Sequence, residues 1–149
     1  MLYQLSEIER LLDEAPGLYV RYSAGYAADL EAGPIDAASG LALPGLPARP
    51  LDPEAWWTLP RREWIARQLT QLPAARHATF EGVHPERFAW LLRGRPAGHG
   101  LDGEALVTDI EVVGRLAECL IAEADRVCDE RFDAEPGRRE AELVSVAHA

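Results

Sequence analysis

Two segments of the chain alternate between apolar and polar residues, which is the pattern of half-buried strands. LYVRYS, residues 18–23, is rich in β-branched and aromatic residues, and EALVTDIEVV, residues 104–113, keeps a period of two over ten positions. RFAWLLR, residues 87–93, is more continuously apolar and predicts a strand that is buried on at least one side. In the first strand, alternation predicts two opposite faces: Leu18, Val20 and Tyr22 on one, and Tyr19, Arg21 and Ser23 on the other.

Three other segments carry apolar residues at helical spacing, and they predict helices over residues 7–15, 61–72 and 116–131. The first should begin with a capping box between Ser6 and Glu9 and end at Pro16-Gly17.

Prolines and glycines concentrate in residues 33–53. Regular helix and central strand are disfavoured there by four prolines, Pro44, Pro47, Pro50 and Pro53. The segment is therefore predicted to be a long ordered loop or a set of short extended pieces.

These elements predict an α+β fold: one compact domain over residues 1–149, with a small mixed or antiparallel sheet and flanking helices. The core should span about residues 18–131. Residues 132–149 are expected to be a tail with a short helix around 138–146.

The composition narrows the range of partners. The net charge is −10, which repels nucleic acid polymers and anionic membranes but leaves room for a small anionic ligand held by a few arginines.

The apolar stretch at the N-terminus contains acidic residues, so no signal peptide is expected, and no segment is apolar enough to span a bilayer. Cys119 and Cys128 lie about 13 Å apart along one predicted helix, too far for a disulfide. A cytoplasmic location fits these features.

GHGLDG, residues 98–103, has the G-x-G-x-x-G spacing of a dinucleotide-binding turn. Such a turn needs a following helix, whose N-terminus holds the pyrophosphate. Here the segment that follows has the period of a strand, so we expect a glycine-rich connection between two strands.

Three polar residues are candidates for chemistry. Arg21 lies in mid-strand, where an arginine needs an anionic partner if it is buried. Glu104 stands at the start of its strand, where a carboxylate can act as a general base or bind a ribose hydroxyl, and His99 on the glycine turn could transfer protons. For each, the alternative is a solvated or ion-paired surface residue.

Several further residues are candidates for ligand binding because they lie near these positions or carry flat rings. Trp56-Trp57 could stack on a flat ligand or cover an edge of the core. The remaining candidates are Tyr22, Ser23, Tyr26, Asp29, Gln68 and Asp102. No nucleophilic triad is visible, and the four histidines, His77, His84, His99 and His148, do not match a zinc pattern.

The blocks LYVRYS, GLPARPL, WW, WIARQL and GHGLDGEALV occur in the order found in an uncharacterised family of small actinobacterial proteins, which the chain resembles over about residues 18–113. That resemblance implies no function. The chain departs from the family's usual pattern at Pro47 and over residues 101–105.

Residues 18–33 and 104–107 are also similar, in order and kind, to small ADP-ribosyltransferases of the rifamycin-modifying type. This resemblance implies NAD as a cofactor, with Arg21 on its pyrophosphate and Glu104 near the nicotinamide ribose.

Two functions therefore stay open. The first is a ligand-binding or transferase-like domain, whose site would lie between the strand at 18–23 and the glycine turn. The second is a non-catalytic module that docks a protein partner through the Pro/Trp segment 44–57, and it predicts an exposed apolar patch at Trp56 or Trp57.

Overall fold

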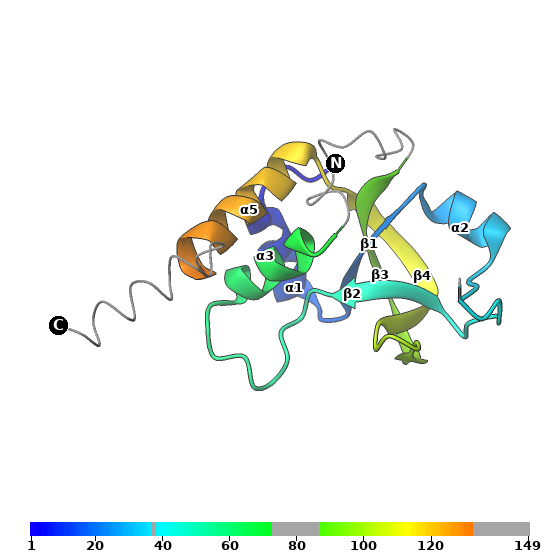
Figure 1. Cartoon of the computed structure of the whole chain (residues 1–149). Helices are drawn as coiled ribbons and strands as arrows, with labels where there is room; N and C mark the ends of the chain where they lie inside the picture. Colours follow the sequence, from blue (N-terminus) through cyan, green and yellow to red (C-terminus); the bar gives the residue numbers. More distant parts are fainter. Residues whose placement is uncertain (37, 73–86, 133–149) are drawn as a thin grey trace.

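Four antiparallel strands form the centre of the structure, a computed structural model that describes residues 1–36, 38–72 and 87–132 (Figure 1). The strands are β1 (Leu18–Ser23), β2 (Leu46–Pro50), β3 (Phe88–His99) and β4 (Ala105–Arg115). The helices are α1 (Leu5–Glu14), α2 (Tyr26–Ala32), α3 (Arg61–Thr70) and α5 (Glu118–Phe132). The predicted α+β class is confirmed.

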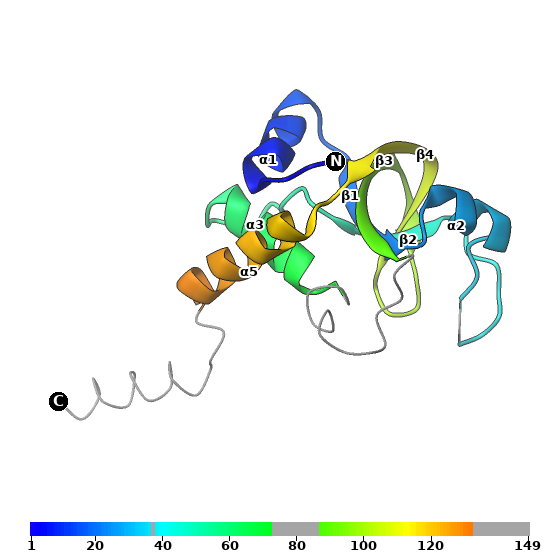
Figure 2. The same cartoon turned by 90° about the horizontal axis from the view of Figure 1, so that it is seen from above.

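The sheet closes on itself in the order β1-β2-β4-β3, and Figure 2 shows the strands as a ring. β1 pairs with β3 along its whole length, from Leu18 opposite Arg93 to Ser23 opposite Phe88. β3 and β4 form a long hairpin whose register shifts at three places. Such shifts bend and twist a strand, which lets so few strands curl into a barrel.

β2 is the strand that closes the barrel. The alternative of short extended pieces predicted for residues 33–53 is confirmed there, but the expectation that the prolines exclude a central strand was wrong. Its first half pairs with β4, with Leu46 opposite Val107, and its second half pairs with β1, with Tyr19 opposite Pro50. Because each residue of β2 has a strand on one side only, a proline without an N–H does not break a ladder. The Pro47 carbonyl is directed away from β4, where it accepts a hydrogen bond from Arg21.

The two faces of β1 lie in two separate cores, as alternation predicted. Leu18 and Val20 belong to the larger core, on the outside of the barrel, where α1, α3 and α5 pack. Tyr19 belongs to the smaller core inside the barrel, to which every strand contributes: Tyr19, Ala48, Trp90, Leu92 and Val107. The larger core also reaches Leu2, Leu5 and Ile8, outside the span of 18–131 predicted for it.

The other predicted strands and helices are present with shifted ends. β3 continues to His99, past the predicted end at 93, and α2 was missed altogether. α1 begins at Leu5, so the capping box predicted for Ser6 and Glu9 was wrong. The carboxylate of Glu7 accepts from the Gln4 amide instead, at 3.1 Å. This start places Leu5, Ile8 and Leu12 on one buried face. Residues 73–85, for which the sequence predicts a loop, and the tail helix predicted at 138–146 lie outside the described residues.

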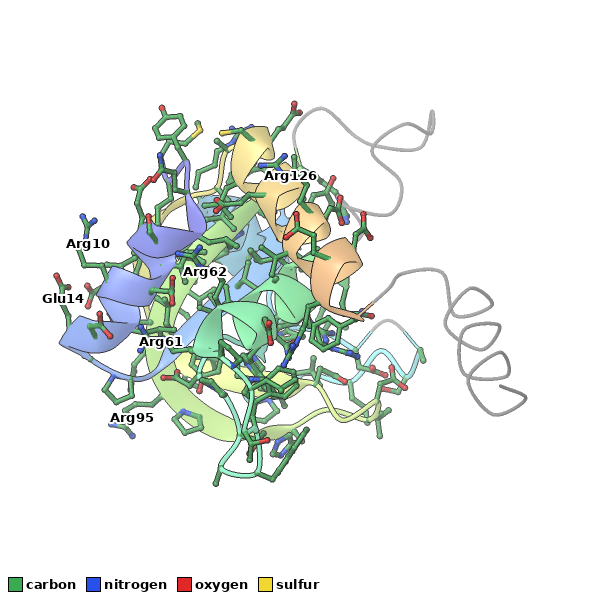
Figure 3. The ribbon with its side chains drawn as sticks, turned by 90° about the vertical axis from the view of Figure 1, so that its left-hand side faces the viewer. Arg10, Glu14, Arg61, Arg62, Arg95 and Arg126 are labelled. Atoms are coloured by element: carbon green, nitrogen blue, oxygen red, sulfur yellow. The ribbon has the colours of Figure 1, made fainter. Side chains whose placement is uncertain are left out.

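Charged residues tie α3 to α1 across the surface of the larger core. Arg62 donates to the carboxylate of Glu9 at 2.8 Å, and Arg61 reaches both the Glu9 carbonyl and the carboxylate of Asp13. Figure 3 shows these two arginines beside α1, with Arg10 and Glu14 on the outer side of that helix. Solvent screens such pairs, so they orient the helices more than they stabilise them.

Tyr19 makes stability depend on pH in the alkaline range. Burial raises the pKa of its hydroxyl above the usual 10, and the nearby charge of Asp52 adds to the shift. A raised folded-state pKa stabilises the protein below pH 10, and this contribution is lost as the pH rises through the folded pKa. We expect the free energy of unfolding, measured in urea, to fall above pH 10 and to fall less in Tyr19→Phe. Tyr3→Phe, at an exposed position, is the control and should follow the wild type.

Candidate functional site

The carboxylate of Asp29 is the centre of a polar network at one end of the barrel. It accepts from Arg21 Nε at 2.8 Å and from Nη2 at 3.2 Å, and from the hydroxyl of Ser23 at 2.8 Å. Asp29 lies on α2, whereas Arg21 and Ser23 lie on the inward face of β1. The side chains of Arg21 and Asp29 are 22% and 10% exposed, so the ion pair is largely shielded from water.

Ser23 connects this ion pair to the barrel interior. Its hydroxyl oxygen accepts from Trp90 Nε1 at 3.0 Å and from the Gly25 amide at 3.1 Å. Gly25 has φ 107°, and an added Cβ would meet the Phe88 ring at 3.0 Å, so the turn into α2 requires glycine. The Tyr26 ring then packs on Trp90, with centroids 6.1 Å apart.

All donor nitrogens of Arg21 are engaged, because its Nη1 donates to the Pro47 carbonyl at 2.8 Å while the others bind Asp29. The guanidinium therefore joins β1, β2 and α2. A pyrophosphate could take it only by displacing Asp29. Tyr22, on the opposite face of β1, packs against the outer core and not beside Arg21.

The glycine turn, residues 98–103, is the tip of the β3–β4 hairpin. This was expected because the segment after the turn has the period of a strand and not of a helix. Glu104 closes it: its carboxylate accepts from the Asp102 amide at 3.1 Å, and its carbonyl accepts from the Gly100 amide at 2.9 Å. Gly100 has no room for a side chain because that carboxylate occupies the space. His99 and Asp102 are exposed at this tip. The catalytic roles considered for Glu104 and His99 stay predictions.

Segment 51–60, α3 and the end of α5 together carry a cluster of four aromatic rings, which we call the aromatic surface: Trp56, Trp57, Trp64 and Phe132. Trp64 is buried at its base, with ring centroids 5.3 Å from Trp57 and 6.0 Å from Trp56. Trp56 is 70% exposed. The guanidinium of Arg67 lies 4.9 Å from the centre of the Phe132 ring.

Sequence reasoning found part of this cluster. The WW dipeptide indicated Trp56 and Trp57. Trp64 fell within the helix predicted over residues 61–72 and Phe132 within the tail predicted over 132–149, so neither was a candidate. Gln68, a proposed ligand-binding residue, accepts from Arg49 Nε at 2.9 Å. It thereby links α3 to β2.

A half-open cleft of about 300 Å³ lies between α1 and β4. Its lining combines apolar and charged residues: Met1, Leu2, Glu7, Arg10, Leu11, Glu14 and Val113. None of these residues was a candidate from the sequence.

Fold and site define a small α+β domain, an antiparallel barrel of the four described strands with α1, α3 and α5 packed on one side. Residues 1–140 match the Family of unknown function (DUF6098), and the chain belongs to that family. No curated protein and no solved structure matches the chain significantly. Across the described ranges, no helix is long and apolar enough to cross a membrane, and no three His, Cys, Asp or Glu side chains are grouped to hold a metal ion.

Removing the charge of Asp29 should destabilise the fold, because it leaves the shielded guanidinium of Arg21 without its anion. We expect Asp29→Asn to lower the free energy of unfolding by about 2–4 kcal/mol. Urea denaturation followed by tryptophan fluorescence measures the change. Glu31→Gln, on an exposed position of the same helix, is the matched control. A loss no larger than in this control would show that the network does not stabilise the fold.

NAD and pyrophosphate should leave the melting temperature unchanged, because Arg21 already binds Asp29 and Pro47. A ligand present at a hundred times its dissociation constant would raise the melting temperature by about 5–10 °C. Thermal-shift titration detects such a rise. A rise in the wild type that disappears in Arg21→Ala would instead favour the transferase-like function.

Proposed function

We propose that this protein is a non-catalytic binding module that docks a protein partner on its aromatic surface. The observation that carries this proposal is the 70% exposure of Trp56 on a rigid aromatic base. Exposing a large apolar ring to water is unfavourable, and such rings are the residues that contribute most to binding when a partner covers them.

The position of Trp56 is fixed before any partner arrives. Its ring contacts Trp57 at 6.2 Å and Trp64 at 6.0 Å, both edge to face. Trp57 is held in turn by a hydrogen bond from its Nε1 to the Pro60 carbonyl, and Trp64 by one to the Pro50 carbonyl. A preorganised side chain loses little conformational entropy on binding, which favours affinity.

The indole nitrogens also favour recognition of a polypeptide. Those of Trp57 and Trp64 bind carbonyls of the chain itself, whereas Trp56 Nε1 has no acceptor among the described residues. A partner could thus bury the ring and accept its N–H through a backbone carbonyl, a combination for which tryptophan is enriched at interfaces.

The contacts of Arg21 and Glu104, the main residues of the ligand-binding alternative, favour the docking function over that alternative. Arg21 stabilises the barrel through Asp29, and Glu104 stabilises the hairpin tip through the Asp102 amide. Both would have to give up these contacts to bind a nucleotide. Trp56 has no comparable task in the fold.

Site-specific crosslinking in the native host tests the proposal. We expect a photoreactive phenylalanine analogue at position 56 to give a discrete crosslinked protein. The same analogue at Leu101, an exposed apolar residue on the hairpin tip, should not give this product. Identical products at both positions, or none at position 56, would contradict the proposal.

The purified partner then allows a quantitative test. Trp56→Ala should weaken its binding about thirtyfold, corresponding to the roughly 2 kcal/mol typical of a dominant interface residue, and should leave the melting temperature within about 1–2 °C of the wild type. Isothermal titration calorimetry measures the affinity. Leu101→Ala is the control and should bind like the wild type.

A further inference from the structure

The barrel leaves one edge of β4 without a strand beside it. β3 lies along one side of β4, but on the other side β2 pairs only with residues 105–107. From residue 108 to residue 114, the described part of the chain places no strand on that side. Such an edge presents backbone N–H and C=O groups that can pair with another chain.

The next residues along β4 show that this side accepts an extended segment. The Leu2 amide donates to the Arg115 carbonyl, and the Ala117 amide donates to the Leu2 carbonyl, both at 2.8 Å. Leu2 forms an isolated parallel bridge with Leu116 there. The open part of the edge directly continues this pairing.

The cleft between α1 and β4 lies next to the same edge. Val113 of β4 lines it together with Leu2 and Leu11, which supply apolar surface. Val112, which neighbours Val113 and points to the opposite face, is 50% exposed. A strand placed on the edge would direct every second side chain into the cleft and cover Val112 with the others.

Charges around the edge favour a basic occupant. Glu111 is exposed and has no ion-pair partner among the described residues, and Asp109 meets only Arg95, in an exposed pair with a distance of 3.4 Å. Glu7 and Glu14 line the cleft beside a single arginine, Arg10, and Figure 3 shows Arg10 and Glu14 on the outer side of α1. The net charge of −10 acts in the same direction over longer distances.

We infer that the free edge of β4 is a second docking site, which binds an extended segment of a partner protein with alternating apolar and basic residues. The backbone of that segment would add a strand to β4, its basic side chains would lie on the cleft side, toward Glu111, Glu7 and Glu14, and its apolar side chains would cover Val112. This site lies on other elements than the aromatic surface and does not depend on it.

A synthetic peptide, acetyl-Val-Arg-Val-Arg-Val-Arg-amide, is the probe. Amide hydrogen exchange followed by mass spectrometry should show at least tenfold slower exchange in the segment covering 108–114 when the peptide is saturating. The corresponding Val-Glu peptide should give no protection. Absence of protection with the basic peptide, or equal protection with both, would overturn the inference.

Backbone methylation distinguishes strand addition from simple filling of the cleft. In a strand, successive N–H groups point to opposite edges, so methylating the valine nitrogens and methylating the arginine nitrogens block different edges. One of these two peptides should lose binding at least tenfold, and the other should keep it. Equal binding of both would show that no strand is added.

Three protein variants complete the test. Glu111→Arg should weaken peptide binding at least tenfold, whereas Glu118→Arg, an exposed charge reversal on α5, should not. Trp56→Ala should bind the peptide like the wild type, so this result is separate from the test of the aromatic surface. Without peptide, hydrogen exchange in residues 108–114 could become slower as the protein concentration rises. That result would assign the edge to a second copy of the chain and overturn the inference.

Discussion

The barrel depends on the carboxylate of Asp29. The four described strands enclose a small interior core, to which Tyr19, Trp90 and Val107 belong. At one end, Asp29 binds Arg21 and Ser23 of β1, and through Arg21 it is connected to the Pro47 carbonyl of β2. One carboxylate thereby fixes α2 and two strands, including the strand that closes the barrel. A shielded ion pair of this kind is favourable only because hydrogen bonds satisfy nearly all of its donors and acceptors.

This arrangement changes the interpretation of the polar residues. An arginine in mid-strand and a glutamate beside a glycine turn resemble a nucleotide site when they are considered as isolated positions. In the folded chain, Arg21 and Glu104 are bound to groups of the chain itself, and both contribute to keeping a short, curved sheet in shape. The exposed positions with no such role lie elsewhere, on Trp56 and along β4.

The two proposed docking surfaces share a physical basis. Each presents groups whose exposure is unfavourable: an indole ring on a rigid aromatic base in one case, and unpaired strand backbone beside a cleft with apolar and acidic lining in the other. Each is supported by elements that pack on the larger core, so neither needs to fold on binding. A small barrel with α1, α3 and α5 on one side can hold both surfaces in a fixed relation.

The sequence by itself determined three of the strands and three of the helices, apart from their ends, and the two faces of β1. Alternation in LYVRYS correctly separated Leu18 and Val20 from Tyr19, and the period of residues 104–113 correctly excluded a nucleotide-binding helix after the glycine turn. These results are local, because side-chain direction follows directly from backbone period. Only the tertiary structure decided that residues 46–50 form a strand despite two prolines. The prolines are tolerated because each residue of β2 pairs with a strand on one side only. The tertiary structure also decided that Arg21 binds Asp29, that Trp64 and Phe132 support Trp56, and that β4 keeps a free edge. Each of these depends on which distant segments meet, and no local pattern encodes that.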